Sequence, residues 1–128
     1  MKETIIISEV FNCSPRELYE AWLDSTKHSE MTGGKAEITD KIGEEFTAWD
    51  GYIRGKNQEL IPHEIIRQSW RTSDFGEEDE DSEVKITLTE NKNGCFLVLE
   101  HTNIPEGHKQ YFKGWEDHYF VPMKTYFS

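Results

Sequence analysis

The sequence predicts an α+β domain in which a curved antiparallel sheet wraps round a long C-terminal helix. Three observations support this prediction: β-rich segments between residues 35 and 102, a capped helix near the N-terminus, and an aromatic C-terminal segment with helical spacing. The chain has 128 residues, which suffices for one domain with its own core but not for two. We therefore expect residues 1–128 to form a single domain.

The N-terminal part predicts one strand followed by a helix. Residues 4–11 are β-branched and apolar, which favours a strand. Ser14 fits an N-cap, Pro15 fits the first helical position, and Glu17 stands where a capping box needs an acidic side chain. A second short helix is expected from Ser25 to Met31, ended by Gly33-Gly34.

The middle of the chain predicts six further strands, for about seven in all. The segments 36–40 and 44–53 alternate in polarity, and Asp50-Gly51 has the composition of a two-residue hairpin turn. Residues 52–60 and 63–72 are expected as strands separated at Pro62. Residues 82–90 and 95–102 predict a hairpin around Asn93-Gly94, preceded by a solvated acidic loop at 76–81.

The C-terminal segment predicts a helix that crosses the sheet. Seven strands at ~4.8 Å each and a helix of ~20 residues both span roughly 30 Å. Pro122 interrupts the pattern at a cost of about 3 kcal/mol, but several buried rings outweigh that cost, so we expect a bend near His118 and Pro122. The side chains expected to face the sheet are Phe112, Trp115, Tyr119, Met123 and Tyr126, and those expected to face water are Lys113, Glu116, Asp117 and Lys124.

The charge and composition argue against several partners. The formal net charge is -11, from 14 Lys and Arg against 25 Asp and Glu, so the average surface field repels nucleic acid and anionic lipid. No apolar stretch has transmembrane length, and no export signal is recognisable at the N-terminus. We therefore expect a cytoplasmic protein in which Cys13 and Cys95 stay reduced.

The polar residues predict neither catalysis nor a metal or cofactor site. The five histidines, at 28, 63, 101, 108 and 118, form no HExxH motif and no compact cluster with cysteine. Glu44-Glu45 and the acidic residues 77–81 fit solvated loops, and the capping role of Ser14 accounts for that hydroxyl. Because no acid–base pair, GxSxG or phosphate loop is present, we expect a protein that is not an enzyme.

One histidine is a candidate for the interior. His101 shares a strand face with Leu97 and Leu99, so the imidazole points inward if these leucines do. Phe96 and Val98 offer the alternative inward face, and the sequence leaves this choice open.

Three stretches of the sequence together carry a resemblance to a known family: "VFNCSPRELYEAWLDSTKHSEMTG", "GYIRGKNQELIPHEIIRQSWR" and "LVLEHTNIPEGHKQYFKGWEDHYFVPMKTYF". They resemble the C-terminal domain of the activators of Hsp90 ATPase, within the START-like (SRPBCC) helix-grip superfamily. The resemblance implies a seven-stranded sheet round a long helix, an apolar cavity in many members, and an Hsp90 partner for the eukaryotic activators. Those activators have a further N-terminal domain that is important for stimulation, so we do not expect residues 1–128 alone to stimulate the chaperone.

Two functions follow from this resemblance as hypotheses. The first is a non-catalytic, stress-related module that binds an Hsp90-type chaperone or another protein. The alternative is a binder of a small hydrophobic or aromatic ligand held between the C-terminal helix and the sheet. The candidate cavity residues are Trp22, Phe46, Trp70, Leu97, Leu99, His101, Phe112, Trp115 and Tyr119.

Overall fold

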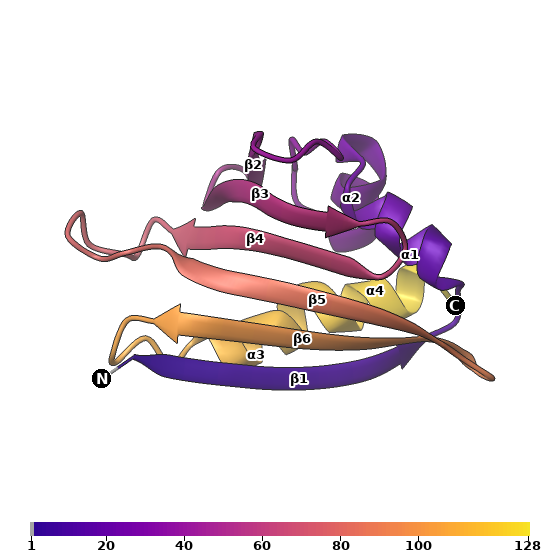
Figure 1. The fold of residues 1–128 in the computed structure, drawn as a ribbon. Coiled ribbons are helices and arrows are strands. Elements are labelled where there is room, and N and C mark those ends of the chain that lie inside the picture. Colours follow the sequence, from indigo (N-terminus) through magenta and orange to yellow (C-terminus); the bar gives the residue numbers. More distant parts are fainter. Residues whose placement is uncertain (1) are drawn as a thin grey trace.

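The structure, a computed structural model, describes residues 2–128 as one antiparallel sheet with helices against one face (Figure 1). The sheet has six strands in the order β1-β6-β5-β4-β3-β2. The C-terminal helical segment lies across the sheet, and the two N-terminal helices lie at one end of it (Figure 1). The strands are β1 (Glu3–Phe11), β2 (Glu45–Ala48), β3 (Ile53–Ile61), β4 (Ile65–Thr72), β5 (Ser82–Asn91) and β6 (Gly94–Ile104).

The prediction of about seven strands was one too many. Residues 36–40 form no strand, because only Glu37 pairs with the sheet, through an isolated bridge to Thr47. Asn57 fills the place where further pairing would occur: its side-chain amide donates to the carbonyl oxygens of Thr39 and Lys41 at 2.8 and 3.1 Å. In a seventh strand, these two carbonyl oxygens would accept hydrogen bonds from the backbone of the adjacent strand. Here a side chain of β3 donates to them instead.

The first helix, α1 (Pro15–Trp22), begins as the sequence predicts. The Ser14 hydroxyl accepts from the backbone N–H of Glu17 at 3.1 Å, and the Glu17 carboxylate accepts from the backbone N–H of Ser14 at 2.9 Å. The second helix, α2 (Ser25–Thr32), ends at Gly33, whose φ of 88° is the left-handed conformation typical of a C-cap. Both predicted helices are therefore confirmed.

The C-terminal segment is helical throughout, in three parts: α3 (Tyr111–Trp115), a π turn η1 (Glu116–Phe120) and α4 (Val121–Tyr126). In the π turn, the backbone N–H of Val121 bonds to the carbonyl oxygen of Glu116, five residues earlier. The wider turn comes directly before Pro122, whose ring would meet the carbonyl of His118 in a regular α-helix. The irregularity that Pro122 predicted is thus a π turn.

The inward face of this helix differs from the prediction at both ends. Trp115, Tyr119 and Met123 are buried as expected, whereas Phe112 is 47% exposed and Tyr126 is 38% exposed. Buried residues stand at every fourth position from Tyr111 to Met123, with Phe120 buried in addition, and Phe112 turns outward. An α-helix has 3.6 residues per turn, so side chains spaced four apart gradually move round the helix, away from the face that contacts the sheet. The wider π turn reduces this rotation and keeps them on one face.

The two predicted hairpins turned out differently. Asn91 pairs with Gly94, so the tight turn between β5 and β6 is confirmed. The turn at Asp50-Gly51 is longer than predicted, because the last pair of β2 and β3 is Ala48 with Ile53 and four residues lie between them.

Candidate functional site

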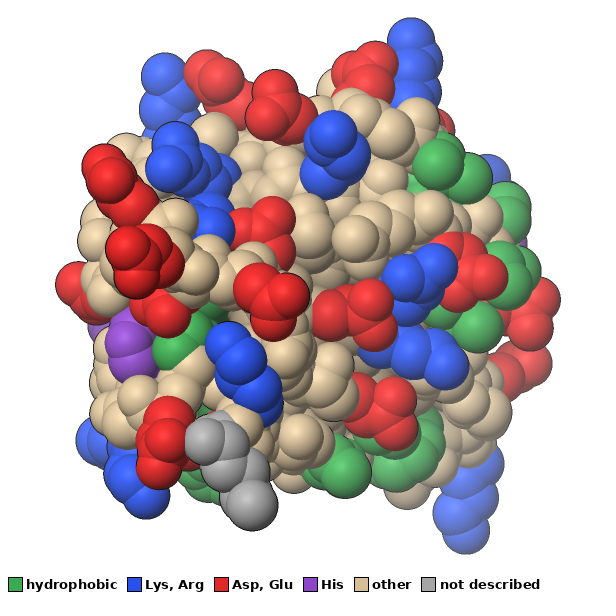
Figure 2. All heavy atoms as spheres, turned by 60° about the vertical axis from the view of Figure 1, so that its left-hand side comes forward, with side chains coloured by type: hydrophobic (Ala, Val, Ile, Leu, Met, Phe, Trp, Pro, Cys, Tyr) green, Lys and Arg blue, Asp and Glu red, His purple; other side chains and the backbone are tan. Residues whose placement is uncertain are grey.

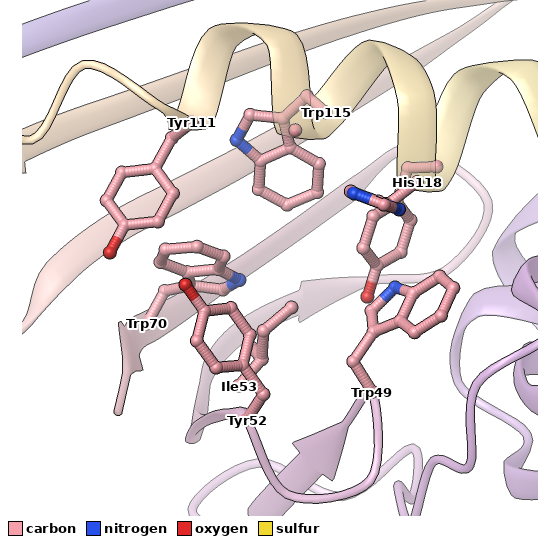
Figure 3. A pocket seen from close by; sticks show the side chains of 9 residues that line it. Trp49, Tyr52, Ile53, Trp70, Tyr111, Trp115 and His118 are labelled. Atoms are coloured by element: carbon pink, nitrogen blue, oxygen red, sulfur yellow. The ribbon is translucent and has the colours of Figure 1, made fainter. Parts of the chain in front are cut away.

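A cavity of about 250 Å³ lies between the C-terminal helix and one end of the sheet (Figure 3). Aromatic rings approach it from three directions: the helix, the strands, and the loop between β2 and β3. The lining residues are Trp49, Tyr52, Ile53, Trp70, Tyr111, Gly114, Trp115, His118 and Tyr119.

The cavity has an apolar interior and a more polar mouth. Among the lining residues, Ile53, Trp70 and Trp115 are buried, whereas Tyr52 and His118 are exposed. The hydroxyl of Tyr52 donates to a carboxylate oxygen of Asp74 at 2.6 Å, which places a negative charge near the mouth. Such a site suits an apolar molecule with one polar end.

Trp49 reaches the cavity from a backbone with unusual geometry. Its φ is 51° and that of Asp50 is 59°, in the left-handed region that bulky residues rarely adopt. Asp50 holds the loop in place: its N–H donates to the Lys35 carbonyl oxygen at 3.0 Å, and its carboxylate accepts from the Lys35 N–H at 3.2 Å. The Trp49 ring also lies so close to Gly34 that a Cβ there would collide with it.

Behind the cavity, His101 links three strands to the C-terminal helix. The Ser82 hydroxyl donates to the Trp70 carbonyl oxygen at 2.6 Å, so it accepts from Nε2–H of His101 at 2.8 Å. Nδ1 of His101 accepts from Nε1–H of Trp115 at 3.0 Å. Both ring nitrogens are used in the neutral form, and His101 is fully buried.

A second buried histidine binds the same helix. Nδ1–H of His28 donates to the Trp22 carbonyl oxygen at 2.7 Å, and Nε2 accepts from the Tyr119 hydroxyl at 3.1 Å. His28 and His101 are therefore neutral in opposite tautomers.

Burial changes the acidity of these groups in the direction that keeps them neutral. Burial lowers the pKa of His101 to about 3. Burial also lowers the pKa of His28, although the hydrogen bond to the Trp22 carbonyl partly offsets this shift. Burial raises the pKa of Tyr111 to about 12 and also raises the pKa of Tyr119. Burial therefore favours the neutral form of all four groups.

Three of the nine predicted cavity residues line the cavity: Trp70, Trp115 and Tyr119. Trp22 lies behind them: the centroid of its ring is 6.5 Å from that of Trp115 and 5.1 Å from that of Tyr119. His101 also lies behind the lining, in contact with Trp70 and Trp115. Its inward orientation is settled, because Leu97 and Leu99 are fully buried while Phe96 and Val98 are half-buried.

The other predicted cavity residues lie elsewhere. Leu97 and Leu99 belong to the core beneath the helix. Phe46 lines a separate, more polar hollow beside Arg71 and Phe75. Phe112 is directed to solvent from the outer side of the helix, because Tyr111 takes the inward position.

Sequence reasoning did not select six lining residues: Trp49, Tyr52, Ile53, Tyr111, Gly114 and His118. A signal for two of them was present, because Trp49 and Tyr52 flank Asp50-Gly51, and large aromatic side chains are unusual in a turn.

Comparison with known proteins identifies the family. The family model for "Activator of Hsp90 ATPase homolog 1-like protein" matches residues 12–128. The chain belongs to this family. A curated family relative, the "Activator of 90 kDa heat shock protein ATPase homolog" of Dictyostelium discoideum, is 27% identical over 128 residues, covering 98% of this chain and 33% of the relative. The chain thus spans about a third of that relative's length.

Solved structures show the same fold. A crystal structure of an HSP90 activator from Plasmodium falciparum matches with a TM-score of 0.86 and 26% identity, covering 96% of this chain and 94% of that one. The solution structure of the Aha1 dimer from Colwellia psychrerythraea matches with a TM-score of 0.77 and 16% identity, covering 98% of this chain and 93% of that one.

Two kinds of feature are absent from residues 2–128. No helix there is both long and apolar enough to pass through a membrane. No group of three or more His, Cys, Asp and Glu side chains is arranged there to hold a metal ion.

Proposed function

We propose that this domain is a non-catalytic, stress-related binding module that docks onto an Hsp90-type chaperone in the cytoplasm. The similarity to the HSP90 activator from Plasmodium falciparum carries the proposal, because it extends over 96% of this chain and 94% of that one. The Dictyostelium relative, named for the same activity, supports it independently of structure. Activation of the ATPase is a property of those proteins, and here we propose binding alone.

The surface charge supports docking onto a basic region of the partner. The formal net charge is -11, and Figure 2 shows acidic side chains spread among basic ones over one face of the molecule. Contacts between exposed charges are screened by salt over a Debye length of about 8 Å at physiological ionic strength. The complex should therefore form faster and more tightly at low salt.

Calorimetric titration of the host's Hsp90-type chaperone tests this proposal. We expect saturable binding that weakens between low and high salt, and we do not expect this domain alone to increase ATP hydrolysis. An absence of saturable binding at low salt, with correctly folded protein on both sides, would exclude the chaperone as a partner.

We propose a second candidate function, the binding of a small aromatic ligand, because the cavity of about 250 Å³ is lined almost entirely by rings. Native mass spectrometry of gently purified protein tests it. Gly114→Leu is a matched variant, since a side chain at this position projects into open space and reduces the cavity. We expect it to lose ligand and retain chaperone binding. A wild-type protein that binds no aromatic compound would exclude this second function.

A further inference from the structure

The cavity contains a hydrogen-bond donor that the protein itself leaves unused. Nε1 of Trp49 is buried and has no hydrogen-bond partner, and no other buried side-chain nitrogen or oxygen in residues 2–128 shares this condition. The indole nitrogens of Trp22 and Trp115 both donate, to Gln68 and His101. Leaving such a donor unpaired costs about 1–3 kcal/mol, and this cost is recovered when a ligand supplies an acceptor.

Contacts on two sides position the Trp49 ring. The ring lies against Gly34 on one side and meets the His118 ring edge-on, with centroids 5.4 Å apart. Its loop has left-handed backbone at two residues before Gly51 and is tied to Lys35 in both directions. In Figure 3, the indole nitrogen is on the side of the ring that faces the other lining side chains. Strained backbone that holds a polar atom in this way is typical of binding sites.

We propose that Nε1–H of Trp49 is the specificity-determining donor of the cavity, and that its ligand is an uncharged, planar, two-ring aromatic molecule with a hydrogen-bond acceptor. The inference rests on the second candidate function above and names its ligand class. Because Nε1 has almost no accessible surface, binding includes a small rotation of the Trp49 ring.

The size of the cavity sets the number of rings. An apolar protein cavity of about 150 Å³ holds one benzene molecule. The cavity here measures about 250 Å³, which accommodates a second fused ring but not a large polycyclic ligand. Flat rings also match the edge-on and tilted arrangements that the lining side chains adopt among themselves.

The charges around the cavity favour a neutral ligand. An anion would approach a protein of net charge -11 and pass the Asp74 carboxylate, which is hydrogen-bonded to Tyr52 at the mouth. A cation could lie over the aromatic rings, but it would offer no acceptor to Trp49 and leave that donor unpaired. A carbonyl or ether oxygen satisfies the donor without bringing a charge.

Three naphthalene compounds of similar shape test the inference by calorimetry. They are 2-acetylnaphthalene, which has a carbonyl acceptor, 2-isopropenylnaphthalene, in which a CH₂ group replaces that oxygen, and the anionic 2-naphthoate. We expect the ketone to bind about tenfold more tightly than the alkene, the effect of one hydrogen bond. We expect naphthoate to bind more weakly than the ketone.

NMR of the indole N–H groups identifies the donor. We expect the Trp49 signal, assigned by its absence in Trp49→Phe, to shift with the ketone and remain in place with the alkene. Trp49→Phe retains a ring but lacks the donor, so it should bind both compounds equally. Gly34→Ala retains the donor but displaces the ring, and it should reduce the preference for the ketone.

The possible failures are distinguishable. If ketone and alkene bind wild-type protein equally, Trp49 is not the anchor, although the cavity remains a ligand site. If naphthoate binds most tightly, the ligand class is wrong. If none of the three binds up to its solubility limit, both this inference and the second candidate function are excluded, while chaperone binding is unaffected.

Discussion

Nε1 of Trp115 donates a hydrogen bond of 3.0 Å to Nδ1 of His101, and this bond joins the C-terminal helix to the middle of the sheet. Both side chains are buried, and the other nitrogen of His101 is occupied by Ser82. The bond therefore fixes both the tautomer of His101 and the orientation of a ring that lines the cavity.

Trp115→Phe should destabilise the protein by about 1–3 kcal/mol, because it leaves Nδ1 of His101 buried without a donor. Urea unfolding followed by circular dichroism measures the change. Trp22→Phe is the matched control, since the Nε1 of Trp22 makes a longer bond of 3.4 Å to Gln68. Equal losses for the two variants would show that ring volume matters more than the hydrogen bond.

Stability should fall as the pH drops below about 6.5. The ordinary histidine pKa of 6.5 applies to the unfolded chain, whereas burial lowers the pKa of folded His101 to about 3. Between these values the unfolded state binds a proton that the folded state does not, so stability is full above pH 6.5 and decreases toward pH 3. His28 acts in the same direction. Each histidine contributes a slope of up to ~1.4 kcal/mol per pH unit.

Thermal and urea unfolding between pH 5 and 7 measure this slope. His101→Gln retains a donor and an acceptor but cannot titrate, so its stability should depend less on pH than that of the wild type. An identical pH dependence in the two proteins would rule out His101 as the source.

Two glycine substitutions should have opposite effects. Gly114→Ala meets open space within the C-terminal helix and should stabilise the protein by about 0.5–1 kcal/mol, because alanine favours the helix. Gly55→Ala would place a Cβ against the backbone carbonyl of Ser69 on β4 and should destabilise by about 1–3 kcal/mol or more. Differential scanning calorimetry of both variants provides the measurement, and a stabilised Gly55→Ala would contradict the packing of β3 on β4.

Ser14→Ala should cost about 1 kcal/mol, since it removes the acceptor that caps α1. Ser8→Ala serves as the control, because Ser8 is exposed on β1 and its loss should change stability by less than about 0.5 kcal/mol. Urea unfolding of the two variants should separate them. A loss as small as that of the control would mean that the cap does not contribute to folding.

Local signals were sufficient for much of the fold. Ser14, Pro15 and Glu17 predicted the start of α1 correctly because capping depends on residues three positions apart. The β5–β6 hairpin followed from Asn93-Gly94 and the alternation on either side of it. Alternation alone left open which face of β6 points inward, and the packing decides for Leu97, Leu99 and His101. The C-terminal helix followed from its aromatic spacing.

Other features depended on contacts between distant segments. Residues 36–40 have the composition of a strand, but the side chain of Asn57 binds the carbonyl group of Thr39 and that of Lys41 just beyond the segment. Phe112 and Tyr111 are neighbours in sequence, and only the π turn and the sheet beneath decide which of them faces inward.

The sequence by itself determined the fold class, the capped helices, the family resemblance and the acidic surface, because each depends on residue type and short spacing. Tertiary structure alone decided where the cavity lies and which rings line it. Trp49 comes from a turn and Trp115 from a helix, and no local pattern relates them. Their meeting, and the unpaired nitrogen of Trp49, result from the way the helix packs across the sheet.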